Sequence, residues 1–264
     1  MNNVSVSKKV VVVGDKFNEF SNGRNVVTIS QLELITQIPA NIIDTNTKFI
    51  AGQGVREDYA GKVLGNMHRN KHHDNKIDLT DLQRLTTTER NYHSHKKEKY
   101  NTLIGTAERV NENLFALPLL IDERCELMGD HQTGKHVQGM ILVEACRQTF
   151  IAITEEFYMS EKLGQSYYVI NDMNMNFSNF LFPLPAFVHY ELLERDVNER
   201  RSRFKATIRI SQHTTLCASM AVSFTVYPAT VISEKETTMA DSLTQSMLQA
   251  HHSASQVEGG TTHA

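Results

Sequence analysis

The sequence predicts an α+β domain in which an antiparallel sheet wraps one long, buried helix. The helix is predicted from Gly139 to about Tyr158, because this segment is apolar around most of its circumference and has no Gly or Pro after Gly139. A helix of that kind must be buried on most sides. Two later segments alternate apolar and polar residues, which is typical of strands with one packed face.

Strand-like segments stand on both sides of the helix. Two precede it, and Asn111 to Asn113 form a turn between them. Four follow it, and the last two carry the clearest alternation. Two strands, a buried helix and four strands indicate a hotdog fold, with the sheet around a central helix. The predicted strands are Leu103 to Val110, Leu114 to Ile121, Ser166 to Asn176, Ala186 to Asp196, Phe204 to Ile210 and Leu216 to Val226.

The first third of the chain is less regular. It contains a β-rich run, Val10 to Val13, and a short predicted helix from Ser30 to Ile38, which Pro39 closes. The stretch Met67 to Lys76 is nearly devoid of apolar residues, so it cannot bury enough surface to offset its ordering entropy. We therefore expect residues 1–90 to form an N-terminal extension with a polar linker.

The hotdog domain is expected at residues 91–228, and residues 229–264 follow it. This last segment has no aromatic residue and 11 Ser or Thr, a composition that predicts a flexible tail. Met239, Leu243 and Met247 nevertheless have the spacing of one stripe on a short helix.

Composition limits the partners and the compartment. Lys+Arg 27 against Asp+Glu 30 gives a net charge of -3, so no basic field is available for nucleic acid or for an anionic membrane. The three cysteines form no Cys-x-x-Cys pair, which suits a reducing compartment. No stretch has the apolar length of a signal peptide or a membrane span, so a cytoplasmic protein is expected.

A polar loop ahead of the long helix carries the candidate chemistry. It brings Asp130, His131, Lys135 and His136 to the N-terminus of the helix. Gly139 has no side chain to block approach, so the free N–H groups there can hydrogen-bond a carbonyl oxygen or an oxyanion. We expect this helix end to be part of an active site.

Three polar residues follow on one face of the same helix. Glu144, Arg147 and Gln148 are spaced i, i+3 and i+4, so their side chains lie together. A buried carboxylate and guanidinium need partners, either each other or a ligand. The alternative is a structural network that closes a dimer. Cys146, between them, is interpreted as a small buried residue.

These residues resemble the signature of the A-factor biosynthesis (AfsA-type) hotdog family. The run Asp130-His131, His136-Val-Gln-Gly-Met140 and Leu142-Val-Glu-Ala-Cys-Arg-Gln148 is similar to the family's helix motif, and His95-Lys96 to its upstream element. The resemblance covers about Tyr92 to Pro228. Gln138 stands where the family usually has proline. Only one repeat is present where the family usually has two, which predicts that two chains dimerise.

The resemblance implies an acyltransferase of γ-butyrolactone-type signal or secondary-metabolite biosynthesis. The family reaction moves a β-ketoacyl group from a carrier-protein thioester to the hydroxyl of a small acceptor such as dihydroxyacetone phosphate. The expected partner is an acyl carrier protein or acyl-CoA, and the phosphopantetheine arrives with the substrate, so no cofactor is expected. Such a site needs an oxyanion donor, a base and a cation for the phosphate. The candidates are Gly139, Glu144, His131 and His136 for catalysis, and Arg147, Lys135, Gln148 and Asp130 for substrate binding.

Two other functions fit the same residues. The spacing of Gly139 and Glu144 also resembles that of hydroxyacyl-carrier-protein dehydratases. A dehydratase or thioesterase, with Glu144 acting on a β-hydroxyl proton or on water, is therefore an alternative. A non-catalytic module that binds an acyl chain or a carrier protein is another. Arg147 separates transferase from hydrolase, since only the transferase needs a phosphate acceptor.

Metal and nucleotide sites are not predicted. The histidines between His68 and His73 have no carboxylate or cysteine at compensating spacing, so the sequence predicts no metal site. Val13-Gly14-Asp15 and Gly52-Gln53-Gly54 look like pieces of phosphate-binding loops. Neither completes such a motif, so nucleotide binding is not expected.

Overall fold

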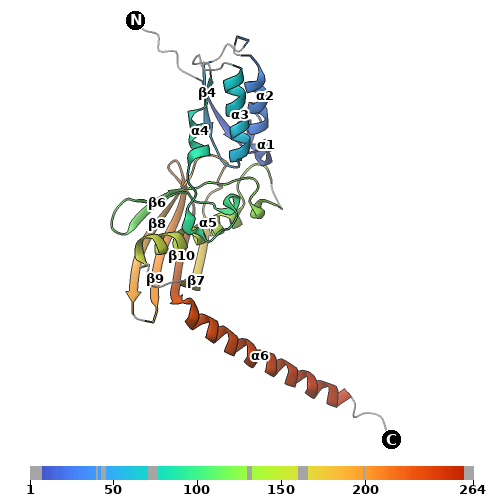
Figure 1. The fold of residues 1–264 in the computed structure, drawn as a ribbon, viewed down its shortest axis with the longest axis vertical. Coiled ribbons are helices and arrows are strands. Elements are labelled where there is room, and N and C mark those ends of the chain that lie inside the picture. Colours follow the sequence, from blue (N-terminus) through green and yellow to red (C-terminus); the bar gives the residue numbers. More distant parts are fainter. Residues whose placement is uncertain are drawn as a thin grey trace.

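The computed structural model describes residues 8–39, 41–42, 46–70, 77–129, 133–159, 166–198 and 200–258. They form two packed units and a projecting C-terminal helix (Figure 1). The second unit is a six-stranded antiparallel sheet with helix α5 against one face, the hotdog arrangement expected from the sequence. In sheet order its strands are β5 (Glu108–Arg109), β6 (Leu114–Pro118), β8 (Phe187–Val197), β9 (Ser202–Gln212), β10 (Thr215–Pro228) and β7 (Ser166–Phe177), and the helix is α5 (Gly139–Ile153).

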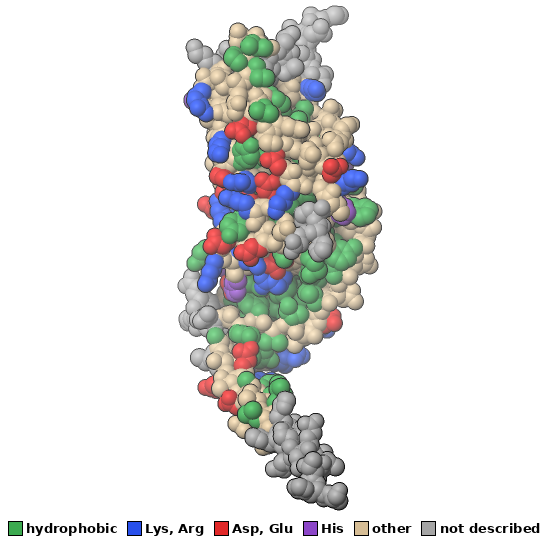
Figure 2. Space-filling view, turned by 90° about the vertical axis from the view of Figure 1, so that its right-hand side faces the viewer, with side chains coloured by type: hydrophobic (Ala, Val, Ile, Leu, Met, Phe, Trp, Pro, Cys, Tyr) green, Lys and Arg blue, Asp and Glu red, His purple; other side chains and the backbone are tan. Residues whose placement is uncertain are grey.

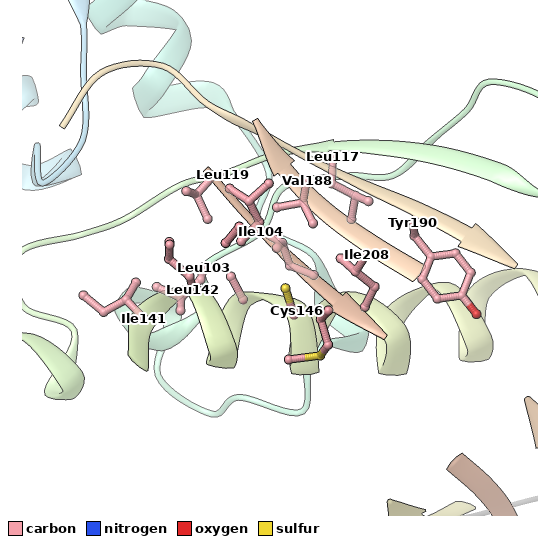
Figure 3. Packing of buried hydrophobic residues seen from close by; sticks show 14 of the residues in the cluster. Leu103, Ile104, Leu117, Leu119, Ile141, Leu142, Cys146, Val188, Tyr190 and Ile208 are labelled. Carbon is pink, nitrogen blue, oxygen red and sulfur yellow. The ribbon is translucent and has the colours of Figure 1, made fainter. Parts of the chain in front are cut away.

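The core of this unit lies between α5 and the sheet (Figure 3). Leu142 and Cys146 project from the helix toward Val188, Tyr190 and Ile208 of β8 and β9, and all five side chains are buried. Removing such apolar surface from water contributes about 25 cal/mol per Å² and is the main stabilising effect. The interpretation of Cys146 as a small buried residue is confirmed, and burial raises the pKa of its thiol to about 12.

The predicted turn at Asn111 is confirmed, but the strand before it is much shorter than predicted. Asn111 Oδ1 accepts two backbone hydrogen bonds, both of 3.0 Å, and so closes the turn. Of the predicted strand Leu103 to Val110, only β5 pairs as a strand. The Leu103 N–H is not available for strand pairing, because it donates to the Gln148 side chain at 2.7 Å.

Strand β10 follows the predicted alternation only from Ala218 onward. Leu216, expected in the core, is half-exposed, whereas the next residue, Cys217, is buried. The pairing register with β9 shifts between Leu216 and Ala218, which marks a β-bulge. A bulge inserts one extra residue and so exchanges the inward and outward positions on its two sides.

Helix α5 begins at Gly139, as predicted, and is α-helical to Ile153. It continues as one π-helical turn, Thr154–Tyr158, so the helical segment has the predicted length. π-turns within α-helices are frequent at functional sites.

The first 90 residues are not an irregular extension, which corrects the expectation from the sequence. Residues 8–51 and 77–78 contribute four parallel strands in the order β2-β1-β3-β4, flanked by helices. These strands have two to six residues, too few for a clear periodicity, which explains why the unit was missed. The elements are β1 (Lys8–Val13), α1 (Asn18–Ser21), β2 (Val26–Thr28), α2 (Ile29–Gln37), β3 (Thr47–Ala51), α3 (Glu57–Arg69), β4 (Ile77–Asp78) and α4 (Thr80–Thr87).

Local signals within this unit explain its helices. The predicted helix at Ser30 to Ile38 is confirmed as α2, and a capping box at Thr28 and Gln31 starts it. The Thr28 N–H donates to Gln31 Oε1 at 2.9 Å. The predicted polar linker is partly helix α3, and its remainder, residues 71–76, lies outside the described residues.

The two units meet at the carboxyl ends of β1 and β3. A Cβ on Gly14 would lie 2.3 Å from the Gly54 carbonyl oxygen, so only glycine fits there. The Gln53 side chain donates to the Leu119 carbonyl at 2.9 Å and accepts from the Ile121 N–H at 2.8 Å. This edge is where parallel α/β sheets bind ligands. Here residues of the hotdog unit, among them Leu119 and Ile121, occupy this edge. The loops that contain Gly14 and Gly54 therefore form the contact between the two units, which we call the seam.

The segment after Pro228 forms a long helix, α6 (Ala229–Glu258), and not the flexible tail expected from its composition. It leaves the lower end of β10 and projects away from both units (Figure 1). Ile232 is buried at its base, and the Tyr167 hydroxyl of β7 donates to Glu236 at 2.6 Å. In the described part of the chain, no helix has the length and apolar character needed to cross a bilayer.

Candidate active site

A pocket opens at the N-terminus of α5. It has a volume of about 390 Å³, and its walls are mostly apolar. The side chain of the N-cap residue, Gln138, makes no cap hydrogen bond to the first N–H groups of α5, which lie at this end of the helix. The pocket is lined by His136, Val137, Gly139, Leu142, Phe177, Ser178, Asn179, Phe180 and Leu181.

The loop before the helix keeps the conformation that a proline would impose. Gln138, which replaces the family's usual proline, has φ -64° and ψ 147°. The Val137 N–H donates to the Leu181 carbonyl at 2.8 Å, which ties the loop to the segment after β7. The substitution at position 138 therefore leaves the entry to the helix in its expected geometry.

Gly139 is needed for the shape of the pocket. A Cβ at this position would lie 3.1 Å from the ring of Phe177. That distance is tighter than an ordinary van der Waals contact, so a larger residue would push Phe177 and narrow the opening over the free N–H groups. The sequence predicts that Gly139 keeps the helix end accessible because it has no side chain. In the structure, the ring of Phe177 is the group that a side chain at position 139 would contact.

His136 faces the same pocket. Its ring lies against Phe180, with ring centroids 4.6 Å apart. Thr133 Oγ1 lies 3.4 Å from its Nδ1. The imidazole is thus positioned by an aromatic ring and a hydroxyl, and it borders the space in which a substrate would lie.

Glu144 lies on the next turns of α5 within a network of donors. Arg147 donates to it twice, from Nε at 2.7 Å and from Nη2 at 2.8 Å, and the Lys96 ammonium lies 2.8 Å from Oε1. Gln148 Nε2 adds a contact of 3.0 Å. Burial by itself would raise the pKa of Glu144, but these donors outweigh it and lower the pKa to about 2.

Gln148, expected from the sequence to bind substrate, forms hydrogen bonds in the interior of the protein. It is fully buried. Its Oε1 accepts from the Leu103 N–H, and its Nε2 donates to the Asn101 carbonyl at 2.8 Å and to Glu144. The contacts with Leu103 and Asn101 hold the segment before β5 against the helix, and the contact with Glu144 lies within α5.

Lys96 belongs to the Glu144 network, a contact that the sequence did not predict. The upstream His95-Lys96 element is part of the resemblance to the family, and in the structure it contacts the helix through Lys96 and Glu144. No signal in one sequence pairs two residues so far apart along the chain.

A second polar cluster lies at the other end of the same helix face. Glu155, on the π-helical turn, contacts His95 Nε2 at 2.6 Å and His93 Nδ1 at 3.4 Å. Burial would raise the pKa of Glu155, but the two histidines lower it. His95 has a φ of 58°, a left-handed conformation that few non-glycine residues adopt. Among the described residues, no group of three or more His, Cys, Asp or Glu could hold a metal ion.

Three predicted site residues remain: Asp130, His131 and Lys135. Asp130 and His131 lie outside the described residues. Lys135 is exposed on the loop before α5 and is not among the residues that line the pocket. The face of the hotdog unit that carries β7 shows hydrophobic side chains gathered beside charged ones (Figure 2).

The comparisons with solved structures give thioesterases of low sequence identity. A mutant thioesterase from Pseudomonas aeruginosa is 16% identical, with 56% of this chain and 94% of that chain covered and a TM-score of 0.38. A putative thioesterase from Shewanella oneidensis is 12% identical, with 55% and 96% covered and a TM-score of 0.37. A thioesterase from Haemophilus influenzae is 14% identical, with 47% and 78% covered and a TM-score of 0.34. No curated protein matches the chain.

The family comparison is more extensive. Residues 77–228 match the A-factor biosynthesis hotdog domain. The matched region takes in β4 and α4 of the first unit, the His95-Lys96 element, the pocket at Gly139 and the Glu144 network. It ends at Pro228, where α6 begins. Because the match spans more than half of the chain, this protein belongs to the A-factor biosynthesis hotdog family.

Proposed function

We propose that this protein transfers a β-ketoacyl group from a carrier-protein thioester to the hydroxyl of a small phosphorylated acceptor, such as dihydroxyacetone phosphate. The pocket at the N-terminus of α5 carries this proposal. Leu142, Phe177 and Phe180 offer apolar walls for an acyl chain, and the N–H groups at Gly139 offer donors for the thioester carbonyl oxygen. Membership of the family supports the same reaction class.

The transfer forms one C–O bond and breaks one C–S bond. The acceptor hydroxyl attacks the thioester carbonyl, and the helix N-terminus stabilises the negative charge that develops on the carbonyl oxygen. Collapse of the tetrahedral intermediate expels the phosphopantetheine thiolate. His136 is our candidate for the proton carrier, because its ring borders the pocket; it accepts the hydroxyl proton and returns it to the sulfur.

We assign Glu144 a positioning role in this reaction. A carboxylate with a pKa of about 2 is a weak base, and Arg147, Lys96 and Gln148 already occupy its oxygens. Its charge holds Arg147 in a fixed orientation. The Arg147 side chain is 30% exposed, so its outward N–H groups can meet the phosphate of the acceptor, with Lys135 as a second cation.

We also propose that the protein acts as a homodimer through β7. This strand has 12 residues, lies at the edge of the sheet and, among the described strands, pairs with β10 alone. It carries no proline and one charged residue, Asp172, so little opposes pairing along its outer edge. Two copies of β7 running antiparallel would join the sheets, and the second chain would take the place of the second repeat.

Intact-mass spectrometry tests the transferase. A β-ketoacyl carrier protein is incubated with the full chain, with and without dihydroxyacetone phosphate, and we expect loss of the acyl group only with the acceptor. His136→Gln should slow this loss by about 100-fold or more. His213→Gln, an exposed histidine in the β9–β10 turn, is the matched control and should have no effect.

Other results would replace the proposal. Acyl loss without acceptor would identify a thioesterase. Loss of one water from a β-hydroxyacyl carrier protein would identify a dehydratase. An unchanged carrier protein in every mixture would leave a binding module, and normal turnover by His136→Gln would remove His136 from the mechanism.

A further inference from the structure

The apolar stripe of α6 is left exposed by the described part of the chain. Met239, Leu243 and Met247 are 62%, 65% and 58% exposed. They are spaced i, i+4 and i+8 and therefore lie on one face of the helix. A narrow apolar stripe on a projecting helix is stable in water only when something packs against it, since most helix stability in proteins comes from such packing.

The direction of the stripe is fixed at the base of the helix. Ile232 and Glu236 lie on the same helical face as Met239 and Leu243. Ile232 is buried against the sheet, and Glu236 accepts a hydrogen bond from Tyr167 of β7. This face therefore points toward the edge strand, and beyond the end of the sheet its apolar side chains are exposed among the described residues.

A matching apolar surface lies at the far end of β7. Phe177 and Phe180 line the pocket and are 53% and 67% exposed, and Met140, on the first turn of α5, is 60% exposed. In one chain this surface and α6 are at opposite ends of β7, because Pro228, just before α6, pairs with Ser166. Antiparallel pairing of two β7 strands brings the Ser166 end of one copy beside the Phe177 end of the other.

We propose that α6 packs on a second copy of this chain, with its stripe against Met140, Phe177 and Phe180 beside the pocket of that copy. Met239 and Leu243 lie about 15 Å and about 21 Å along the helix from Ala229, within reach of that surface. In Figure 1, α6 leans to the side of β7, the side on which the second copy would lie. Each pocket is then completed by the helix of the other chain.

The charge of α6 favours this partner over a lipid surface. The helix contains Glu234, Glu236, Asp241 and Glu258 against Lys235. Helices that lie on membranes carry Lys and Arg on their polar face, because the lipids there are anionic. This inference rests on the dimer proposed above and is independent of the chemistry of acyl transfer.

Sedimentation velocity over a range of concentrations gives the first test. The full chain should be a dimer, and replacement of Met239, Leu243 and Met247 by Ser should weaken the dimer at least about tenfold. The matched control replaces Glu234, Asp241 and Gln245, on the opposite face, by Ser and should leave the dimer unchanged. A monomer at all concentrations, or equal weakening by both variants, would overturn the proposal.

Cross-linking gives a second test that does not depend on the stability of the variants. The chain with Leu243→Cys and Phe180→Cys should form a disulfide between copies under mild oxidation, visible as a covalent dimer. A chain with Asp241→Cys and Phe180→Cys should not, since position 241 faces away. Equal cross-linking by both would rule out the proposed orientation. No acyl substrate enters either experiment, so failure of the transferase assay would leave these results unaffected.

Discussion

Replacing Glu144 by Gln tests the network on α5 most directly. The change removes the charge that Arg147 and Lys96 share and keeps the size of the side chain. The Glu144 side chain is 15% exposed, so its interactions are only weakly screened by solvent. The difference between a pKa of about 2 in the folded state and the ordinary value of 4.5 corresponds to about 3 kcal/mol of stability at pH 7.

The sign of the pH dependence follows from the direction of the shift. The folded-state pKa of Glu144 is the lower one, so its contribution is complete above a pH of about 4.5 and is lost as the pH falls toward 2. At pH 3 about 1 kcal/mol should remain. The difference in unfolding free energy between the wild type and Glu144→Gln should therefore shrink by about 2 kcal/mol between pH 7 and pH 3.

Urea unfolding of both proteins at several pH values between 7 and 3, followed by circular dichroism, measures this difference. Glu191→Gln is the matched control, because Glu191 also pairs with an arginine, Arg209, but both side chains are about 40% exposed. An exposed pair of this kind contributes less than about 1 kcal/mol. A stability difference for Glu144→Gln that stays constant with pH, or that equals the control, would refute the reasoning.

Three further predictions concern the pocket, the seam and the thiols. Gly139→Ala should reduce acyl transfer at least about tenfold, measured by the mass assay, while the melting temperature changes little, because alanine favours the helix but crowds Phe177. Gln53→Ala should cost about 2 to 3 kcal/mol in urea unfolding and speed proteolytic release of the first unit, because it leaves buried backbone groups unpaired; an unchanged proteolytic pattern would contradict the seam. All three cysteines are buried with raised thiol pKa values, so a thiol reagent at pH 8 should react with them only after unfolding; rapid reaction of the native protein would show that the burial is wrong.

The hotdog unit was predictable because its signals are local. The apolar circumference of α5 and the alternation of apolar and polar residues along β9 and β10 are visible in consecutive residues. Each of these patterns indicates one kind of secondary structure. Gly139 could likewise be placed at the helix start, since its role follows from its own lack of a side chain. The sequence did not predict the β-bulge between Leu216 and Ala218, where the inward and outward positions of β10 are exchanged.

The first unit and α6 were missed for a different reason. The parallel strands are short, and their pairing depends on residues far apart along the chain, such as Val11 with Val26 and with Ile50. Segment α6 has a polar composition, and its helix is held at the base by Ile232 and Glu236 against β7. The composition of a segment indicates how much apolar surface the segment can bury by itself. It does not include the stabilisation that a helix gains by packing against another part of the protein.

For the site, the sequence by itself determined the residue types and their order on α5: a glycine at the helix start and a carboxylate, a guanidinium and an amide on one face. Only the tertiary structure decided their roles. It brought Lys96 to Glu144, sealed Gln148 in the interior and placed His136 beside the pocket. Each of these contacts depends on groups from distant parts of the chain that come within hydrogen-bonding or van der Waals distance in the folded protein. The spacing of residues along one helix does not specify which distant groups these are.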